Sequence, residues 1–104
     1  MSGGIVMRIH RVRSELVVAA CDEELIGQEL AIGSQGHTVR VTAHFYGERV
    51  VSKEELVWAL QRATIANLLG TRVVGLAAQE GLVQPDSCGT LGGVPHAEIV
   101  SVVD

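Results

Sequence analysis

The stretch SKEELVWALQRATIANLLGTRVVGLAAQEG, residues 52–81, carries the strongest helix signals of the chain. Ser52 and Glu55 form a capping box, in which the Ser52 hydroxyl accepts from the Glu55 amide and the Glu55 carboxylate accepts from the Ser52 amide. An apolar stripe with helical spacing follows at Leu56, Val57, Leu60, Ala63, Thr64 and Leu68. Gly70 suits the left-handed position after a helix, and Thr71 can cap a second helix. The stretch therefore predicts two consecutive helices.

The residues before this stretch have the period of strands. Ile5–Val12 alternates apolar with polar side chains, which is typical of a half-buried strand. The continuous apolar run Leu16–Cys21 fits a strand covered on both faces, and the two strands should pair as a hairpin. Asp22 is placed to cap a short helical turn that Gly27 ends. His37–Phe45 alternates again and predicts a third long strand.

The residues after the helical stretch predict one or two further strands. Gly89–Gly93 is too glycine-rich for a strand interior, whereas residues 97–103 alternate as a terminal strand does. Strands followed by helices and again by strands favour an α+β fold over a wound parallel sheet. We expect one domain over residues 1–104. Its architecture should be a two-layer sandwich, a largely antiparallel sheet of about four to five strands with two consecutive helices packed on one face.

Composition narrows the class of protein. Hydrophobic residues make up 47% of the 104-residue chain, which is enough to close one small core. No run approaches the roughly 20 apolar residues of a membrane span, and no leader-like segment precedes Ile5, so we expect a cytoplasmic protein without a membrane partner. Cys21 and Cys88 lie far apart with no CxxC, which argues against a disulfide framework or a zinc knuckle. P-loop, GxGxxG, HExxH and GxSxG motifs do not occur.

Several residues are candidates for a functional site. Cys21 follows a predicted buried strand at the start of a predicted helical turn, where exposed amides would stabilise a thiolate. His96 follows a glycine-proline bend and can titrate near neutrality. Asn67 is expected on the inner side of the first helix, where its amide would tie the helix end to a loop. The candidate site comprises Cys21, Asp22, Glu24, Tyr46, Asn67, Gly93 and His96, with no catalytic residue, cofactor or metal assigned.

Four separated segments carry a family resemblance. They are Cys21-Asp22-Glu23-Glu24-Leu25, Phe45-Tyr46-Gly47, Ala66-Asn67-Leu68-Leu69-Gly70 and Gly92-Gly93-Val94-Pro95-His96-Ala97. In this order and at this spacing they resemble the archaeal family catalogued as domain of unknown function 424, from about Met7 to Val103. The resemblance implies an archaeal cytoplasmic setting and an α+β domain. It transfers no activity, substrate, cofactor or catalytic residue.

The favoured functional hypothesis is a small non-catalytic binding module that associates with RNA or with a protein complex in archaeal information processing. The net charge of −4 argues against electrostatic binding of nucleic acid over the whole surface. A local cluster of Arg8, Arg11 and Arg13 nevertheless exists, and Arg40 on the predicted third strand is a further candidate phosphate contact.

The alternative hypothesis is a small metal- or thiol-dependent enzyme. It requires Cys21 and His96 to meet across neighbouring strand ends, with Asp22 or Glu24 nearby. Strand adjacency is not fixed by the sequence, so this contact remains open. A third possibility, compatible with either hypothesis, is a homodimer face along the sheet or the first helix, because the apolar content is high for one small domain.

Overall fold

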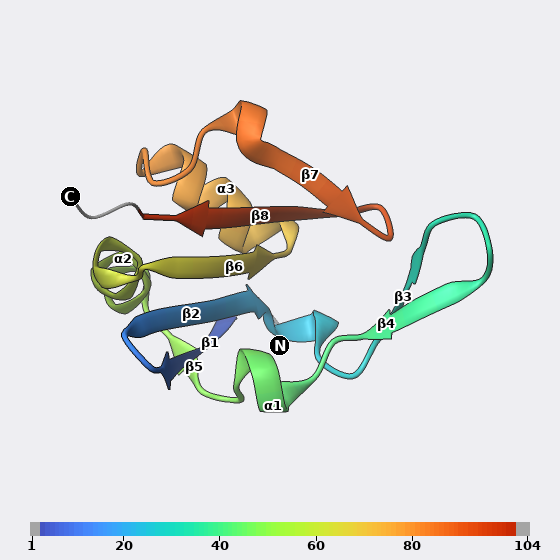
Figure 1. Cartoon of the computed structure of the whole chain (residues 1–104), viewed down its shortest axis with the longest axis horizontal. Coiled ribbons are helices and arrows are strands. Elements are labelled where there is room, and N and C mark those ends of the chain that lie inside the picture. Colours follow the sequence, from blue (N-terminus) through green and yellow to red (C-terminus); the bar gives the residue numbers. More distant parts are fainter. Residues whose placement is uncertain (1–2, 102–104) are drawn as a thin grey trace.

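The computed structural model describes residues 3–101. The strands in this part of the chain are β1 (Ile5–Val12), β2 (Glu15–Asp22), β3 (Glu29–Ile32), β4 (His37–Arg40), β5 (Val50–Val51), β6 (Ile65–Leu69), β7 (Cys88–Leu91) and β8 (Val94–Val100) (Figure 1). The α-helices are α1 (Ala43–Tyr46), α2 (Lys53–Arg62) and α3 (Thr71–Gln79). Two short 3-10 turns, Glu23–Leu25 and Pro85–Ser87, complete the elements.

Six strands form one sheet in the order β5-β1-β2-β6-β8-β7, and β3 pairs with β4 in a separate hairpin that projects from the body (Figure 1). The strands β1 and β2 pair antiparallel over their full length, as the sequence predicted. In this sheet β2 and β6 run parallel, and the other neighbours run antiparallel. The predicted α+β class with a largely antiparallel sheet is confirmed, with six strands instead of four to five.

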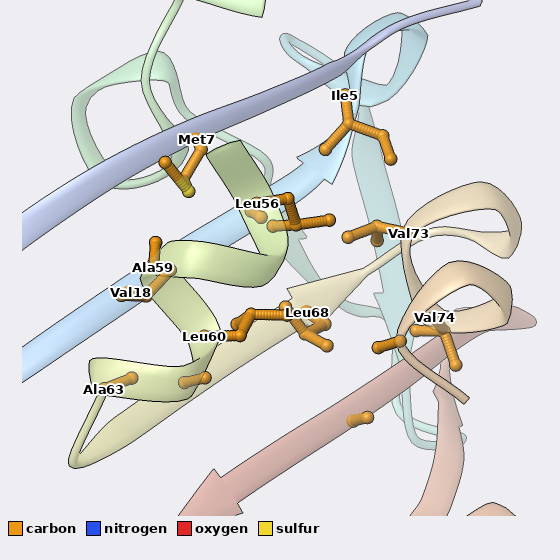
Figure 2. Packing of buried hydrophobic residues seen from close by; sticks show 14 of the residues in the cluster. Ile5, Met7, Val18, Leu56, Ala59, Leu60, Ala63, Leu68, Val73 and Val74 are labelled. Carbon is orange, nitrogen blue, oxygen red and sulfur yellow. The ribbon is translucent and has the colours of Figure 1, made fainter. Parts of the chain in front are cut away.

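The main core lies between the sheet and the helices α2 and α3 (Figure 2). Its buried members include Met7, Val18, Leu56, Leu60, Leu68, Val73 and Val74. A smaller cluster covers the opposite face, where Tyr46 of α1 packs with Leu30 and Val41 over Cys21 and Leu69. The ends of β2 and β6 are therefore covered on both faces, which explains the continuous apolar run Leu16–Cys21 of β2.

The prediction of two consecutive helices is wrong, because β6 separates them. The capping box at Ser52 is present, but α2 ends at Arg62 and Ala63 is extended. Thr64 then fixes the chain beside β2, since its N–H donates to the Leu16 carbonyl (2.9 Å) and its hydroxyl accepts from the Leu16 N–H (2.8 Å). The residues that follow enter a central position in the sheet, where strand pairing outweighs their helical spacing.

The predicted third strand is also shorter than expected. It ends at Arg40, and Thr42 caps the short helix α1 by accepting from the Phe45 N–H (3.3 Å). Its partner β3 was not predicted, and the glycine-containing segment Cys88–Leu91 forms the edge strand β7. The terminal strand is β8, and the expected residues 102–103 lie outside the described range. Among residues 3–101, none of the helices has the length and apolar character needed to cross a membrane.

Candidate functional site

The carboxyl ends of the parallel strands β2 and β6 lie side by side, and α3 begins directly after β6. The start of β8 reaches the same place, because the Gly70 N–H donates to the Pro95 carbonyl (2.8 Å). These segments surround a cleft of about 340 Å³, which we call the carboxyl-end cleft. It is lined by Asp22, Glu24, Leu25, Thr71, Arg72, Gly93, Val94 and Pro95. The carboxyl ends of parallel strands are common ligand sites, so this cleft is the first candidate.

The structure brings the seven predicted site residues to this end of the sheet. Asp22, Glu24 and Gly93 line the carboxyl-end cleft. Cys21, Tyr46, Asn67 and His96 lie beside it, on the sheet face that α1 covers or borders. The separate segments that carried the family resemblance therefore meet in space.

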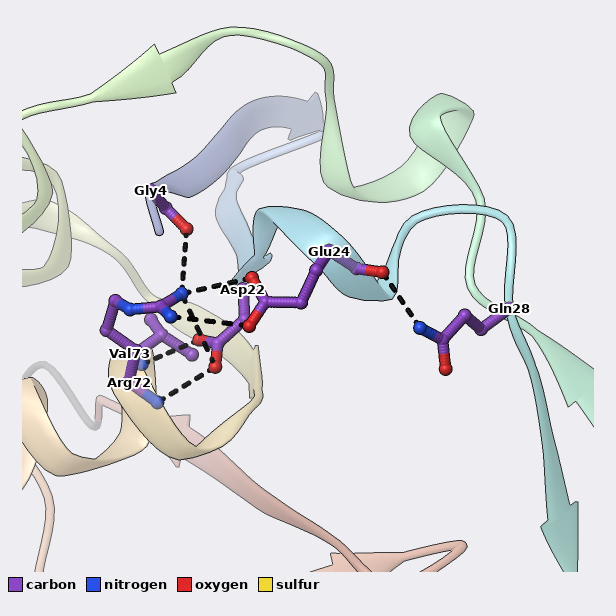
Figure 3. Close-up of polar contacts among 6 residues, drawn as sticks. All are labelled: Gly4, Asp22, Glu24, Gln28, Arg72 and Val73. Carbon is purple, nitrogen blue, oxygen red and sulfur yellow. Dashed lines mark hydrogen bonds and ion pairs between the residues drawn. The ribbon is translucent and has the colours of Figure 1, made fainter. Parts of the chain in front are cut away.

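Asp22 is almost fully buried and caps α3 (Figure 3). Its carboxylate accepts from the Arg72 and Val73 backbone N–H groups, both at 2.9 Å. The N-cap residue before α3 is Gly70, with φ of 131°, and a Cβ there would collide with the Asp22 carboxylate. The predictions that Asp22 caps the turn at Glu23–Leu25 and that Thr71 caps the second helix are wrong. An internal carboxylate already fills the anion-binding end of α3.

Arg72 lines the carboxyl-end cleft. Its side chain makes polar contacts with Gly4, Asp22 and Glu24 (Figure 3). Its guanidinium donates to both carboxylate oxygens of Glu24, at 3.1 and 3.3 Å, and to the Gly4 carbonyl at 3.2 Å. The hydrogen bonds from Arg72 lower the pKa of Glu24 below its ordinary value, so this carboxylate is charged at neutral pH. The arrangement ties the start of β1 and the turn after β2 to α3.

The Cys21 thiol is a poor nucleophile in this environment. The side chain is fully buried, and this burial, followed by the charges of Asp22 and Glu24, raises its pKa to about 12. Because the thiolate is the reactive form, Cys21 is protonated and unreactive near neutrality.

Tyr46, Asn67 and His96 form a hydrogen-bonded group. The Tyr46 hydroxyl donates to Asn67 Oδ1 (2.8 Å), and His96 Nε2 lies 3.3 Å from the same oxygen. Burial raises the pKa of Tyr46 to about 12, with a further contribution from Cys21, so the hydroxyl stays protonated. Asn67 lies on β6, which corrects the prediction that it lies on the first helix. Its side chain links α1 to β8 across the sheet.

Cys21 and His96 do not lie on neighbouring strands. Cys21 is opposite Leu69 in the β2–β6 pair, and Leu69 is opposite His96 in the β6–β8 pair. Two strand spacings, roughly 10 Å, therefore separate their backbones. Within residues 3–101, no three His, Cys, Asp or Glu side chains are grouped so as to hold a metal ion.

The four candidate arginines do not share one surface. Met7 packs in the main core and Val6 in the smaller cluster, so alternation along β1 places Arg11 on the α2 side and Arg8 on the α1 side. Arg13 lies in the β1–β2 turn with φ of 58°. Arg40 lies on the projecting hairpin, where it pairs with Glu29 (3.0 Å).

The outer edge of β1 is open over the second half of the strand. The short strand β5 pairs only with Ile5 and Val6, and the Met7 N–H donates to the Arg49 carbonyl (3.3 Å). Because Met7 directs its N–H to this side, Ile9 and Arg11 also direct their backbone groups outward. No strand in the part of the chain that the structure describes pairs with them there.

A groove of about 320 Å³, the β1-edge groove, lies beside this open edge, between β1 and α2. It is lined by Met7, Ile9, Arg49, Glu54, Glu55 and Trp58. Trp58 is 55% exposed, with Arg62 stacked over its ring at 4.0 Å. The sequence-based site did not include this groove. The sequence does contain an indication of this groove. Trp58, the only tryptophan, lies outside the apolar stripe of the helix, so a large apolar side chain is directed away from the core.

The elements and their order define a small α+β domain built on a six-stranded, mostly antiparallel sheet. The chain belongs to the family described as protein of unknown function DUF424, whose model matches residues 10–102. No curated protein matches the chain. A crystal structure of an uncharacterized conserved protein from Methanopyrus kandleri is similar, with a TM-score of 0.78 and 28% identity over 93% of this chain and 90% of that one. The family predicted from the four motifs is confirmed.

Proposed function

We propose that the chain is a non-catalytic binding module that takes an extended segment of a protein at the outer edge of β1. The observation that carries this proposal is the open edge itself. Ile9 and Arg11 direct backbone donors and acceptors outward, next to the β1-edge groove. An added strand would satisfy these groups through main-chain hydrogen bonds, while its alternate side chains enter the groove.

The buried groups at the carboxyl-end cleft support a structural rather than a reactive role. Asp22 is occupied as a helix cap, and both Cys21 and Tyr46 are protonated near neutrality. The thiol-dependent alternative needs a thiolate in contact with the His96 imidazole, and β6 lies between them. This geometry favours binding over catalysis.

The RNA form of the binding hypothesis receives less support than the protein form. It would use Arg8, Arg11, Arg13 and Arg40 as phosphate contacts. These residues lie on two faces of β1, in the β1–β2 turn and on the β3–β4 hairpin, so they do not form one basic surface. The protein form requires only a partner chain whose extended segment completes the sheet at this edge.

Site-specific photo-crosslinking in an archaeal lysate tests the proposal. A photoreactive side chain at position 11 should crosslink to a protein, whereas one at the exposed Glu98, far from β1 in the sheet, should not give the same product. Ile9→Pro removes an outward N–H, which an edge strand tolerates, and should abolish the crosslink. Ile9→Val keeps the N–H and should retain it.

Two results would contradict the proposal. One is an unchanged crosslink in a folded Ile9→Pro variant. The other is recovery of RNA instead of protein, lost in the Arg8/Arg11/Arg13 triple alanine variant, which would establish the RNA form. Circular dichroism of each variant verifies that the fold is retained.

A further inference from the structure

The exposed apolar side chains concentrate at the side of the sheet where the β1 edge is open. Among residues 3–101, six large apolar side chains are exposed: Ile9, Val12, Val39, Val50, Trp58 and Val100. Four of these six belong to β1, β5 and α2, which border the open edge. An unpaired strand beside clustered exposed apolar side chains is typical of a protein-binding surface.

The limits of the open edge restrict how a symmetric partner can pair. The segment before β5 covers the first half of β1, because Met7 bonds to Arg49 and the Gly47 backbone lies against Met7 and Arg8. The chain turns at Arg13. The free edge is therefore the second half of β1, with His10 at its middle.

Only one register of an antiparallel β1–β1 pair fits these limits. A pair centred on Ile9 would place the partner's Arg11 opposite Met7, whose N–H is already used. A pair centred on Arg11 would oppose two arginines directly, which is unfavourable. With His10 at the centre, Ile9 lies opposite the partner's Arg11. Both residues direct their backbone N–H and C=O groups toward the partner strand, so they can form a hydrogen-bonded pair.

The charges of the β1-edge groove fit this register. Ile9 and Arg11 lie on the α2 side of the sheet, so the partner's Arg11 would extend over the groove beside Ile9. The groove carries Glu54 and Glu55, and Glu55 already pairs with Arg49 (2.9 Å). Glu54 is exposed and available to the incoming guanidinium. By symmetry, each copy completes the groove of the other.

We propose that the strand that fills the β1 edge belongs to a second copy of this chain, paired antiparallel with His10 opposite the partner's His10. This inference rests on the proposed function, because it names the occupant of the same edge. The resulting sheet would be continuous across the dimer, with twelve strands from two sixes. The partner's Arg11 would bind Glu54.

Charge exchange across the interface is the first test. Sedimentation at about 100 μM should show a dimer. Arg11→Glu should weaken the dimer by about tenfold, because two symmetric contacts become repulsive. Glu54→Arg should weaken it similarly, and the Arg11→Glu/Glu54→Arg double variant should recover most of the affinity. Arg13→Glu, a matched reversal in the turn, should have a smaller effect.

A cross-strand disulfide is the second test and reads the register directly. In a Cys88→Ser background, His10→Cys should give a disulfide-linked dimer on mild oxidation, since opposed residues of a non-hydrogen-bonded pair come close enough for the bridge. Arg8→Cys should not, because its expected neighbour is the partner's Val12. Two results together would overturn the inference. The charge variants would leave the affinity of the dimer unchanged, and the His10→Cys variant would form no disulfide-linked dimer.

The outcomes separate this inference from the proposed function. A monomer at about 100 μM that still crosslinks from position 11 to a different protein, with loss in Ile9→Pro, would leave the strand-accepting edge intact and refute self-pairing. Absence of any edge-dependent protein contact would refute both.

Discussion

At the scale of single residues, Asp22 is the predicted site residue whose side chain caps a helix. Replacing it with alanine removes both bonds that cap α3 and leaves two N–H groups without their partner. We expect Asp22→Ala to lower the free energy of unfolding by about 2 kcal/mol, and Asp22→Asn to lower it less. Urea denaturation measures both. Asp86→Ala, at an exposed aspartate, is the control, and an equal loss there would contradict the capping role.

The raised pKa values of Cys21 and Tyr46 predict a dependence of stability on alkaline pH. Each group binds its proton more tightly in the folded state, where the pKa is about 12, than in the unfolded state, where ordinary values of 9.0 and 10.0 apply. Their contribution is therefore complete below about pH 9 and is lost as the pH rises toward 12.

Denaturation at several values between about pH 8 and pH 11 measures this dependence. The wild-type free energy of unfolding should fall more steeply with pH than that of the Cys21→Ala/Tyr46→Phe double variant. Each single variant should lie between them. Identical slopes for the wild type and the double variant would show that neither group is responsible.

At the scale of elements, Thr64 decides where α2 ends and β6 begins. Its backbone N–H donates to the Leu16 carbonyl, and its hydroxyl hydrogen-bonds to the Leu16 N–H and carbonyl, at the point where the chain enters the sheet. Thr64→Val should lower the free energy of unfolding by about 1–2 kcal/mol and speed hydrogen exchange of the Leu16 amide. Thr38→Val, which removes an exposed hydroxyl from the β3–β4 hairpin, should change little. Unchanged exchange at Leu16 in the Thr64 variant would contradict this role.

The elements also show what the sequence can and cannot predict. The capping box at Ser52 and the strand at Ile5–Val12 depend on neighbouring residues, and both are confirmed. The burial along this strand does not alternate as expected, because Val6 is buried and Ile9 is exposed. Ile65–Leu69 has helical spacing, but its state is decided by β2, a distant partner that a local pattern does not contain. The same limit applies to Asp22, because its capping partner, the start of α3, is brought to it only by the parallel pair.

The candidate site was predicted in part for the same reason. The four motif segments are separate in the sequence, and the fold brings them together at the ends of β2 and β6. The contact expected between Cys21 and His96 depended on strand order, and β6 occupies the place between them. The open edge of β1 was missed because it is defined by the shortness of β5, a property of the paired partner.

At the scale of the whole molecule, the projecting β3–β4 hairpin has two parts with different importance. Leu30 is buried in the smaller cluster, whereas the tip from Gly33 to Gly36 is exposed. Leu30→Ala should lower the free energy of unfolding by about 2–3 kcal/mol. Replacing the tip with Asn-Gly should leave it nearly unchanged, since that dipeptide closes a tight hairpin. Thermal unfolding of both variants measures the contrast, and a larger loss from the tip would contradict it.

The parallel pair at the centre of the sheet also constrains how the chain reaches its native state. The β1–β2 and β7–β8 hairpins join neighbouring segments, whereas β2 and β6 meet only after the long intervening chain has been looped back. Closing such a loop costs entropy before any central contact forms. We therefore expect the pairing of β2 with β6 to be the rate-limiting step of refolding. The β7–β8 hairpin should dock on β6 afterwards.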